Sequence, residues 1–414
     1  MKRLFGIITA LSLAAVIATG LTACGNNNKN GGSKSETSTR NFEYTLNSDK
    51  ESYTLSGYSI SAEAKTLADK NDYEKLAELF NKTLKEGETE FTAETARTFT
   101  VPATYKDLPV TKIATNALAN LGYIKKLVVT SAVKEIGQSA FSGLSSLEEI
   151  ELPFVGAKDF GYLDLVSNKK CFGYIFGTSE ATGLTSCAQV YNDNAASTSY
   201  YVPSTLKKVT VTGSNKKLGS ETIKYEIIDG KKVETDKEEG TEGVYTDTFD
   251  TYSFAVQPYA FYGCTTIENI VLSGETVEKI WQFTFKNCSS LKSFEFPATT
   301  AEVGEGAFDD CSALTTVDFG SVTTIGKEAF KHCHALGKTS FISENPSITL
   351  TAVTDLGDNA FEGCTSLVSV KFAASGAITI GKEAFLDCSS LSKIEGADSA
   401  TTGADWIKGT KIDS

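Results

Sequence analysis

One short phrase recurs along this chain, and its clearest copy, IGKEAFLDCSSLSKI, occupies residues 380–394. Most copies carry a phenylalanine followed three residues later by a cysteine, and the two earliest fill these positions with Phe141 and Leu144 and with Leu118 and Leu121. A fixed period of about 20–29 residues indicates a solenoid, in which every repeat forms one coil of a stack. We therefore expect the repeated apolar side chains to form continuous interior rows. These anchors are Phe141, Phe261, Phe285, Phe308, Phe330, Phe361 and Phe385, with Cys264, Cys288, Cys311, Cys333, Cys364 and Cys388.

The residues after each anchor alternate as in a strand. In Leu291-x-x-Phe294-x-Phe296, the last two apolar residues fall on one face and the residue between them on the other. A single coil cannot bury that face, so neighbouring coils must stack, with strands about 4.8 Å apart. The residue before each cysteine position is of a type that tolerates a left-handed backbone, as at the end of a short helix. The sequence thus predicts an α/β solenoid with one short strand and one short helix or 3₁₀ turn per repeat.

The full pattern, I-G-x-x-A-F-x-x-C-x-x-L-x-x-I, resembles the BspA-like leucine-rich repeats of bacterial surface proteins. The resemblance runs with interruptions over residues 98–395 and implies a leucine-rich-repeat solenoid. It also implies display outside the cell, with adhesion or binding of host or matrix proteins as in some members of the family. The phrases PFVG at 153–156 and FGYIFG at 172–177 look like an insertion seen within such proteins.

The first residues have the features of a secretion signal. Two basic residues precede an apolar run that extends to Ala23, so residues 1–23 are predicted to be a signal peptide. The sequence Leu-Thr-Ala-Cys ending at Cys24 resembles the bacterial lipobox, which implies lipidation of Cys24. An ordinary cleaved signal peptide and an uncleaved membrane anchor are the alternatives. With residues 24–40 as a flexible tether, we expect an exported protein, anchored to the bacterial cell membrane by this lipid alone and facing the extracellular side.

The rest of the chain divides around the repeats. Two strands at 42–46 and 53–58 are expected to form a hairpin that covers the N-terminal end of the solenoid, and 62–86 have the spacing of an amphipathic helix. That helix is expected to pack on the cap, with partner binding as the alternative. A tail with Trp406 and Ile407 is expected to cover the other end. The predicted divisions are a cap at 41–97, a solenoid at 98–395 interrupted by an aromatic and Gly-rich insertion at 153–202 and a hairpin insertion at 214–255, and a tail at 396–414.

The nine cysteines divide by position. Those locked to the repeat are expected to form a buried column of thiols, each acting as a small hydrophobic side chain. A disulfide ladder is the alternative, but regular stacking rarely supplies the torsion angle that a disulfide requires. Cys171 and Cys187 lie outside the repeats, and the sequence leaves open whether they form a disulfide.

Residues suited to chemistry are scarce. The only two histidines flank Cys333 within residues 332–334, and a Ser-His-Asp or Cys-His site would need one of them. Three consecutive side chains cannot easily point at one metal ion. The acidic group formed by Asp309, Asp310, Glu302 and Glu305 lacks the spacing of a calcium loop. The sequence therefore predicts no catalytic residue, no metal site and no cofactor, and hence no enzyme.

Two surfaces are candidates for binding. The outward strand positions are small and mixed, which predicts weak or polar recognition; they are Val128, Glu151, Thr210, Val271, Glu295, Asp318, Ser340 and Lys371. The segment 153–202 is richer in aromatic residues suited to contact with a protein or a glycan, with a small packed core as its alternative. Its candidate ligand-binding residues are Phe154, Phe160, Tyr162, Tyr174, Phe176, Tyr191, Tyr200 and Tyr201.

Charge and composition restrict the partner. The formal net charge is −13, so the chain lacks the basic face that nucleic acid or an anionic membrane surface requires. We therefore expect a non-enzymatic cell-surface lipoprotein that binds an extracellular protein or glycan. The alternative is a structural or envelope-associated lipoprotein with a role in spacing or self-association.

Overall fold

The structure is a computed structural model that consists mainly of strands, with few helices. The predictions for the signal peptide at 1–23 and for Cys24, Phe160, Tyr162 and Ser340 fall outside the residues it describes. Within the described part of the chain, no helix is long and apolar enough to cross a membrane. The described residues are 39–84, 88–159, 167–228, 231–234, 237, 240–338, 348–374 and 376–413.

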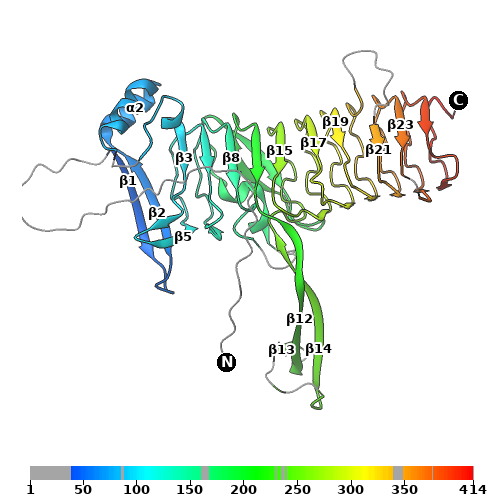
Figure 1. Ribbon diagram of the computed structural model, residues 1–414, viewed down its shortest axis with the longest axis horizontal. Helices are drawn as coiled ribbons and strands as arrows, with labels where there is room; N and C mark the ends of the chain where they lie inside the picture. Colours follow the sequence, from blue (N-terminus) through cyan, green and yellow to red (C-terminus); the bar gives the residue numbers. More distant parts are fainter. Residues whose placement is uncertain are drawn as a thin grey trace, which may run out of the picture.

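The main ladder is a row of short parallel strands that follow one another in sequence order, one from each coil (Figure 1). Apolar side chains at alternate positions point into the coils, so each strand buries one face against the interior. The strands are β3 (Thr98–Thr100), β6 (Lys126–Val128), β8 (Glu149–Leu152), β11 (Lys208–Val211), β15 (Asn269–Leu272), β17 (Ser293–Glu295) and β19 (Thr316–Asp318), followed by β21 (Ile348–Leu350), β23 (Ser369–Phe372) and β25 (Lys393–Glu395) in a separate sheet.

A second ladder is formed by the Ile-Gly part of the repeat. Glycine is needed after these strands because the coils approach closely; a Cβ added to Gly381 would lie 2.4 Å from the backbone nitrogen of Asp358. At the N-terminal side, β5 (Leu108–Ile113) pairs with β7 (Glu135–Ile136) in the same parallel manner. The later strands are β16 (Lys279–Ile280), β18 (Glu302–Val303), β20 (Thr324–Ile325), β22 (Asp355–Leu356), β24 (Thr379–Ile380) and β26 (Thr401–Thr402).

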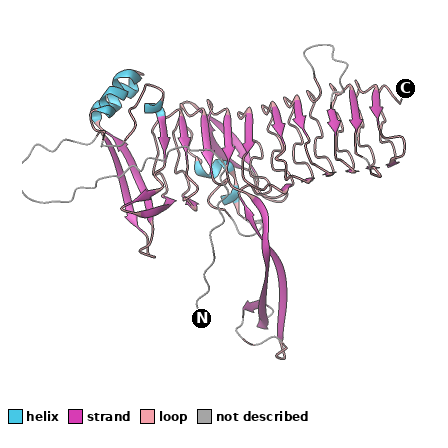
Figure 2. Ribbon diagram, in the orientation of Figure 1, coloured by secondary structure: helices cyan, strands magenta, loops and turns pink. Residues whose placement is uncertain are grey.

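The Ala-Phe part of the regular coils is a turn and not a helix (Figure 2), whereas η3 (Phe172–Ile175) is a 3₁₀ helix at this place in the stack, so the predicted helix or 3₁₀ turn per repeat is found only in part. Each turn keeps local hydrogen bonds, such as Cys311 N to Phe308 O at 3.1 Å, and others join it to the next coil: Phe285 N donates to Ala307 O at 2.8 Å, and Phe308 N donates to Ala329 O at 2.7 Å. The predicted left-handed residue before the cysteine position is confirmed. It has a positive φ at Asn120, Gly143, Gly263, Asn287, Asp310, His332, Gly363 and Asp387.

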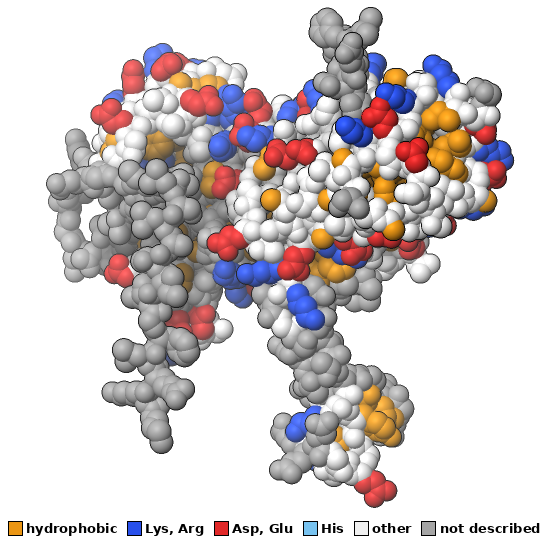
Figure 3. Space-filling view, turned by 45° about the vertical axis from the view of Figure 1, so that its right-hand side comes forward, with side chains coloured by type: hydrophobic (Ala, Val, Ile, Leu, Met, Phe, Trp, Pro, Cys, Tyr) orange, Lys and Arg blue, Asp and Glu red, His pale blue; other side chains and the backbone are white. Residues whose placement is uncertain are grey.

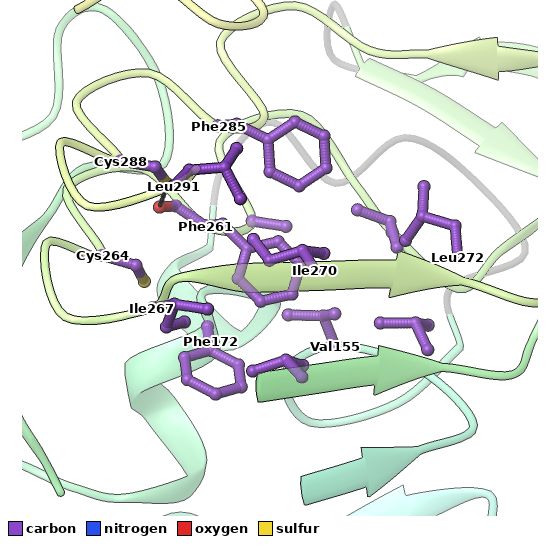
Figure 4. Close-up of a cluster of buried hydrophobic side chains, with 14 of the residues drawn as sticks. Val155, Phe172, Phe261, Cys264, Ile267, Ile270, Leu272, Phe285, Cys288 and Leu291 are labelled. Carbon is purple, nitrogen blue, oxygen red and sulfur yellow. Dashed lines mark hydrogen bonds between the residues drawn. The ribbon is translucent and has the colours of Figure 1, made fainter. Parts of the chain in front are cut away.

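The anchor phenylalanines form one interior row. Their ring centroids are 5.0 Å apart between Phe285 and Phe308, 5.0 Å between Phe308 and Phe330, and 5.3 Å between Phe330 and Phe361. Figure 4 shows part of this row beside the cysteines of the same coils. All seven anchors are fully buried, so the row is the centre of one continuous core.

The cysteines have a polar role that the sequence did not indicate. Cys311 Sγ donates a hydrogen bond to Phe285 O, and Cys333 Sγ donates to Phe308 O, each at 3.2 Å, so each thiol satisfies a carbonyl of the preceding coil. The cysteines in the described residues are all buried and form no disulfide with one another, so the pairing of Cys171 with Cys187 that the sequence left open is not present. Burial raises the pKa of Cys333 well above its usual range, which disfavours the reactive thiolate.

The segment predicted as an interruption at 153–202 is a lengthened coil. Its turn lies in the stack between two regular anchor turns, because Phe141 N donates to Ile175 O at 2.9 Å and Phe172 N donates to Ala260 O at 2.8 Å. The Phe172 ring lies 5.1 Å from that of Phe261 and extends the interior row. The segment contains η2 (Asn168–Lys170), η3 (Phe172–Ile175) and an antiparallel hairpin of β9 (Leu184–Gln189) and β10 (Thr198–Pro203).

The second predicted insertion is an antiparallel arm that extends away from the coils (Figure 1). It is formed by β12 (Asn215–Ile228), β13 (Lys231–Glu234) and β14 (Val244–Phe254). The predicted pairing of β12 with β13 is confirmed, with Ile228 opposite Lys231.

Both ends of the stack are covered. The predicted N-terminal hairpin consists of β1 (Arg40–Leu46) and β2 (Tyr53–Ile60), and β2 pairs with β5. The predicted single helix is two, α1 (Ala62–Asp69) and α2 (Tyr73–Asn81), because Asn71 is left-handed and Asp72 caps α2. At the other end, Phe385 N donates to Trp406 O at 2.8 Å, so the tail continues the coil pattern. The remaining short elements are η1 (Thr95–Arg97) and β4 (Thr104–Tyr105).

Candidate binding surface

The outward side chains of the main ladder form an open face. In β15, Ile270 and Leu272 point inward and are buried, whereas Val271 between them is 38% exposed. The same alternation applies along the ladder, so each coil contributes outward side chains on a backbone held by its neighbours. In the space-filling view, acidic and basic side chains are interspersed and the hydrophobic ones form small groups (Figure 3).

The N-terminal part of this face is a network of paired charges. Glu149 lies between Lys126 at 3.7 Å and Lys208 at 3.8 Å, and Glu268 lies 3.3 Å from Lys207. Exposed pairs of this kind contribute only about 0–1 kcal/mol to stability. They do, however, neutralise one another, which leaves little unbalanced charge for a ligand to meet.

The face opens between β15 and β17. β15 pairs with β11 along its whole length, but it pairs with β17 only where Asn269 faces Ser293. The chain leaving β17 stays with β19, since Phe296 N donates to Asp318 O at 3.1 Å, and Pro297 then follows without an N–H to donate. A hollow of about 300 Å³ lies at this opening.

The lining of the hollow combines apolar side chains with one charged group on rigid strands. Exposed Val271 comes from β15 and Glu295 comes from β17. The other lining residues are Asn269, Ile270, Leu272, Ser293, Phe296, Pro297 and Ala298. Among the described residues, none forms an ion pair with Glu295, in contrast to the paired charges nearer the N-terminus. An apolar contact beside an available carboxylate suits recognition of a partial positive charge or of hydroxyl donors.

A smaller hollow of about 200 Å³ lies between the N-terminal cap and the first coil. Its walls include Phe42, Tyr58 and Phe91, and the Arg40 guanidinium lies 4.6 Å from the centre of the Phe91 ring. Arg40 also pairs with Glu88 at 3.5 Å. The Arg40 contacts lie within the cap, whereas the rings of Phe42 and Tyr58 pack against Phe99 of β3 at 5.9 and 4.6 Å, so we regard this hollow as part of a packing interface.

The aromatic candidates of the lengthened coil are divided by the structure. Phe154, Phe176 and Tyr200 are at most 2% exposed, so they have no surface that a ligand could contact. Phe176 packs against Phe172 with ring centroids 5.2 Å apart, as part of the core. Tyr174, Tyr191 and Tyr201 are partly exposed, and their role in binding stays a prediction.

The groups with shifted pKa values are poor candidates for catalysis. Burial raises the pKa of Cys264 and Cys288, so neither thiol ionises readily. Burial is also the main reason that the pKa of Tyr259 is raised, and its hydroxyl donates to Asp193 Oδ1 at 2.5 Å. All three groups are buried, so they belong to the packed interior of the protein.

Comparison with known proteins identifies the repeat. The BspA type leucine rich repeat region matches in six copies, over residues 87–161, 255–352 and 344–406. No curated protein matches the chain. Three solved structures are similar at a distance: a leucine rich repeat protein of T. pallidum (17% identity, 82% of this chain and 83% of that chain, TM-score 0.27), a leucine rich cell surface protein of Faecalibacterium prausnitzii (18%, 86% and 92%, 0.28) and a leucine-rich repeat protein of Eubacterium ventriosum (14%, 90% and 94%, 0.31).

Those three structures share too little with this chain to support an argument about it. The family match is different, because the matched residues make up more than half of the chain and include every anchor from Phe261 to Phe385. Its residues are also those that form the stacked coils, with strands predominating and few helices. The chain therefore belongs to the BspA type leucine-rich repeat family.

Proposed function

We propose that this protein is a non-enzymatic surface lipoprotein that binds another protein or a carbohydrate through the open face of its main ladder. The observation that carries the proposal is the hollow between β15 and β17, where exposed Val271 and Glu295 stand on strands fixed by their neighbours. A rigid, partly apolar hollow with one available carboxylate needs little rearrangement to bind a ligand. The repeats supply the scaffold, and lipidated Cys24 attaches the protein to the membrane.

The first test is a screen of the purified protein against arrayed glycans and purified extracellular matrix proteins. Saturable binding to a member of either panel is expected. Failure to bind any member, together with reversible self-association in analytical ultracentrifugation, would support the structural or envelope-associated role instead.

The hollow itself is tested by Val271→Arg. We expect this substitution to weaken binding of the ligand found in the screen by about tenfold or more, because a bulky charge would fill the hollow and displace the apolar contact. Affinity is measured by surface plasmon resonance. The matched control is Thr210→Arg, since Thr210 is the register neighbour of Val271 on β11 but lies outside the hollow. An equal loss of affinity in the two variants would show that the ligand binds elsewhere or responds only to the added charge.

The proposed anchoring is tested by Cys24→Ser. Labelled fatty acid should be incorporated into the wild-type protein and not into the variant, because the sulfur of Cys24 carries the lipid in the proposal. The variant should also move from the detergent phase to the aqueous phase in a Triton X-114 partition. If the variant stays in the detergent phase without label, the apolar segment before Cys24 is an uncleaved anchor.

A further inference from the structure

Three potential metal ligands meet where two adjacent coils present their anchor turns. Asp310 and His332 occupy the same position of the repeat, one residue before the cysteine, and both have a left-handed backbone. The coils are in register there, since Asp310 N donates to Lys331 O at 2.9 Å. Asp309 precedes Asp310 and points to the same place. Residues 22 positions apart in the sequence are therefore neighbours on the surface.

The spacing of the three side chains suits one metal ion. His332 Nδ1 lies 3.3 Å from Asp310 Oδ1 and 3.6 Å from Asp309 Oδ1, and the three atoms all lie within 4.8 Å of one another. Metal–ligand bonds of about 2.0–2.2 Å in a tetrahedral arrangement place neighbouring ligand atoms about 3.3–3.6 Å apart. Two of the three separations already have this length.

Asp309 provides an independent sign that a cation belongs here. The residue is only 4% exposed, and its Oδ2 accepts a charged hydrogen bond from Lys286 Nζ at 2.7 Å. Its Oδ1 is buried, has no hydrogen-bond partner and faces His332. A buried carboxylate oxygen without a partner costs stability, and a metal ion at this position would satisfy it.

We propose that Asp309 Oδ1, Asp310 Oδ1 and His332 Nδ1 bind one divalent transition-metal ion, for which zinc is best suited. Imidazole and carboxylate ligands together fit zinc, whereas calcium takes six to eight oxygen ligands. The Asp310 and His332 side chains are 47% and 38% exposed, so water can reach the outer side of the ion and complete its coordination. Lys286 balances one carboxylate and leaves one negative charge to attract the cation. The bound ion would link the coil of Phe308 to the coil of Phe330.

The site is tested by titrating the purified protein with Zn²⁺ in a calorimeter and with Co²⁺ in a spectrophotometer. We expect one ion per chain, with visible cobalt absorption bands and without the near-ultraviolet band of cobalt bound to thiolate. His332→Asn should weaken binding by about tenfold or more. Asparagine is chosen because Asn287 holds the same repeat position with φ of 61°, so the left-handed turn is preserved.

His334→Asn is the matched control, since its ring stacks on His332 with centroids 5.8 Å apart but contributes no ligand atom to the group. It should bind zinc as the wild type does, and Asp310→Asn should weaken binding as His332→Asn does. Circular dichroism of each variant verifies that the coils remain folded. The proposal is overturned if the wild type binds no zinc, if His332→Asn binds it as tightly, or if cobalt shows thiolate bands. In any of these cases, the three side chains form only an ion pair.

Discussion

Replacing Phe308 with alanine is expected to lower the free energy of unfolding by about 3–5 kcal/mol. The Phe308 ring is fully buried and has neighbours on every side, with centroids 5.0 Å from Phe285, 4.9 Å from Phe294 and 5.0 Å from Phe330. Hydrogen bonds between coils hold these neighbours in place, so they cannot easily collapse into the space left by the ring. A residual cavity therefore adds to the lost apolar burial.

The loss is measured by urea unfolding, followed by circular dichroism. Phe385→Ala is the matched control, because Phe385 is also fully buried but lies one coil from the end, with Phe361 at 5.5 Å and Trp406 at 6.3 Å. The end of a stack can relax or fray locally, so Phe385→Ala should lower the free energy of unfolding by less than Phe308→Ala does. A loss below about 1 kcal/mol for Phe308→Ala, or a larger loss for Phe385→Ala, would contradict a single continuous core.

Positions repeated in many coils were predictable because every copy carries the same signal. The left-handed residue before the cysteine was inferred from residue types such as Asn287 and Asp387, which tolerate that backbone. A second left-handed residue lies two positions before the phenylalanine and is not predictable from residue type. Glu328 and Glu383 occupy it in two coils, and glutamate gives no such indication. Hydrogen bonds between coils impose this conformation: Glu328 N, for example, donates to Asp358 O at 2.9 Å.

Coils that depart from the pattern were harder to identify. The tail after 395 forms a further turn in which Gly409 has the left-handed φ of the position before the cysteine, but Ile407 and Thr410 stand where phenylalanine and cysteine would be. Similarly, the turn at η3 completes the stack without the repeated phrase. In both places hydrogen bonding to the neighbouring coil, which the sequence does not display, replaces the usual side chains.

The two candidate sites differ in how far the sequence could have indicated them. The hollow depends on lost pairing between β15 and β17, which neither strand shows by itself, although Pro297 is a local sign. The group of Asp309, Asp310 and His332 could have been found by comparing the same repeat position in consecutive coils. One stretch of sequence does not reveal this group, because the solenoid brings together residues that are one repeat period apart.

The lengthened coil leads to the last prediction, that Gly173→Ala destabilises the protein by about 3 kcal/mol. A Cβ at Gly173 would lie 2.4 Å from both Cβ and Cγ of Tyr200, a fully buried side chain. The backbone at Gly173 cannot move freely away from the Tyr200 ring, because Gly173 N donates to Gln189 Oε1 at 2.6 Å and Gln189 is itself buried. If the segment were a loose insertion, the same substitution would be tolerated.

Urea unfolding again provides the measurement, and Gly376→Ala is the control. Its added Cβ would meet only Thr354 Cγ2 at 3.7 Å, so its effect should stay within about 0.5 kcal/mol. The double variant Gly173→Ala with Tyr200→Ala should lose less stability than the two single losses combined, because removing the ring removes the clash. If the stability loss of the double variant equals the sum of the two single losses, the contact between Gly173 and Tyr200 does not hold this turn in the stack.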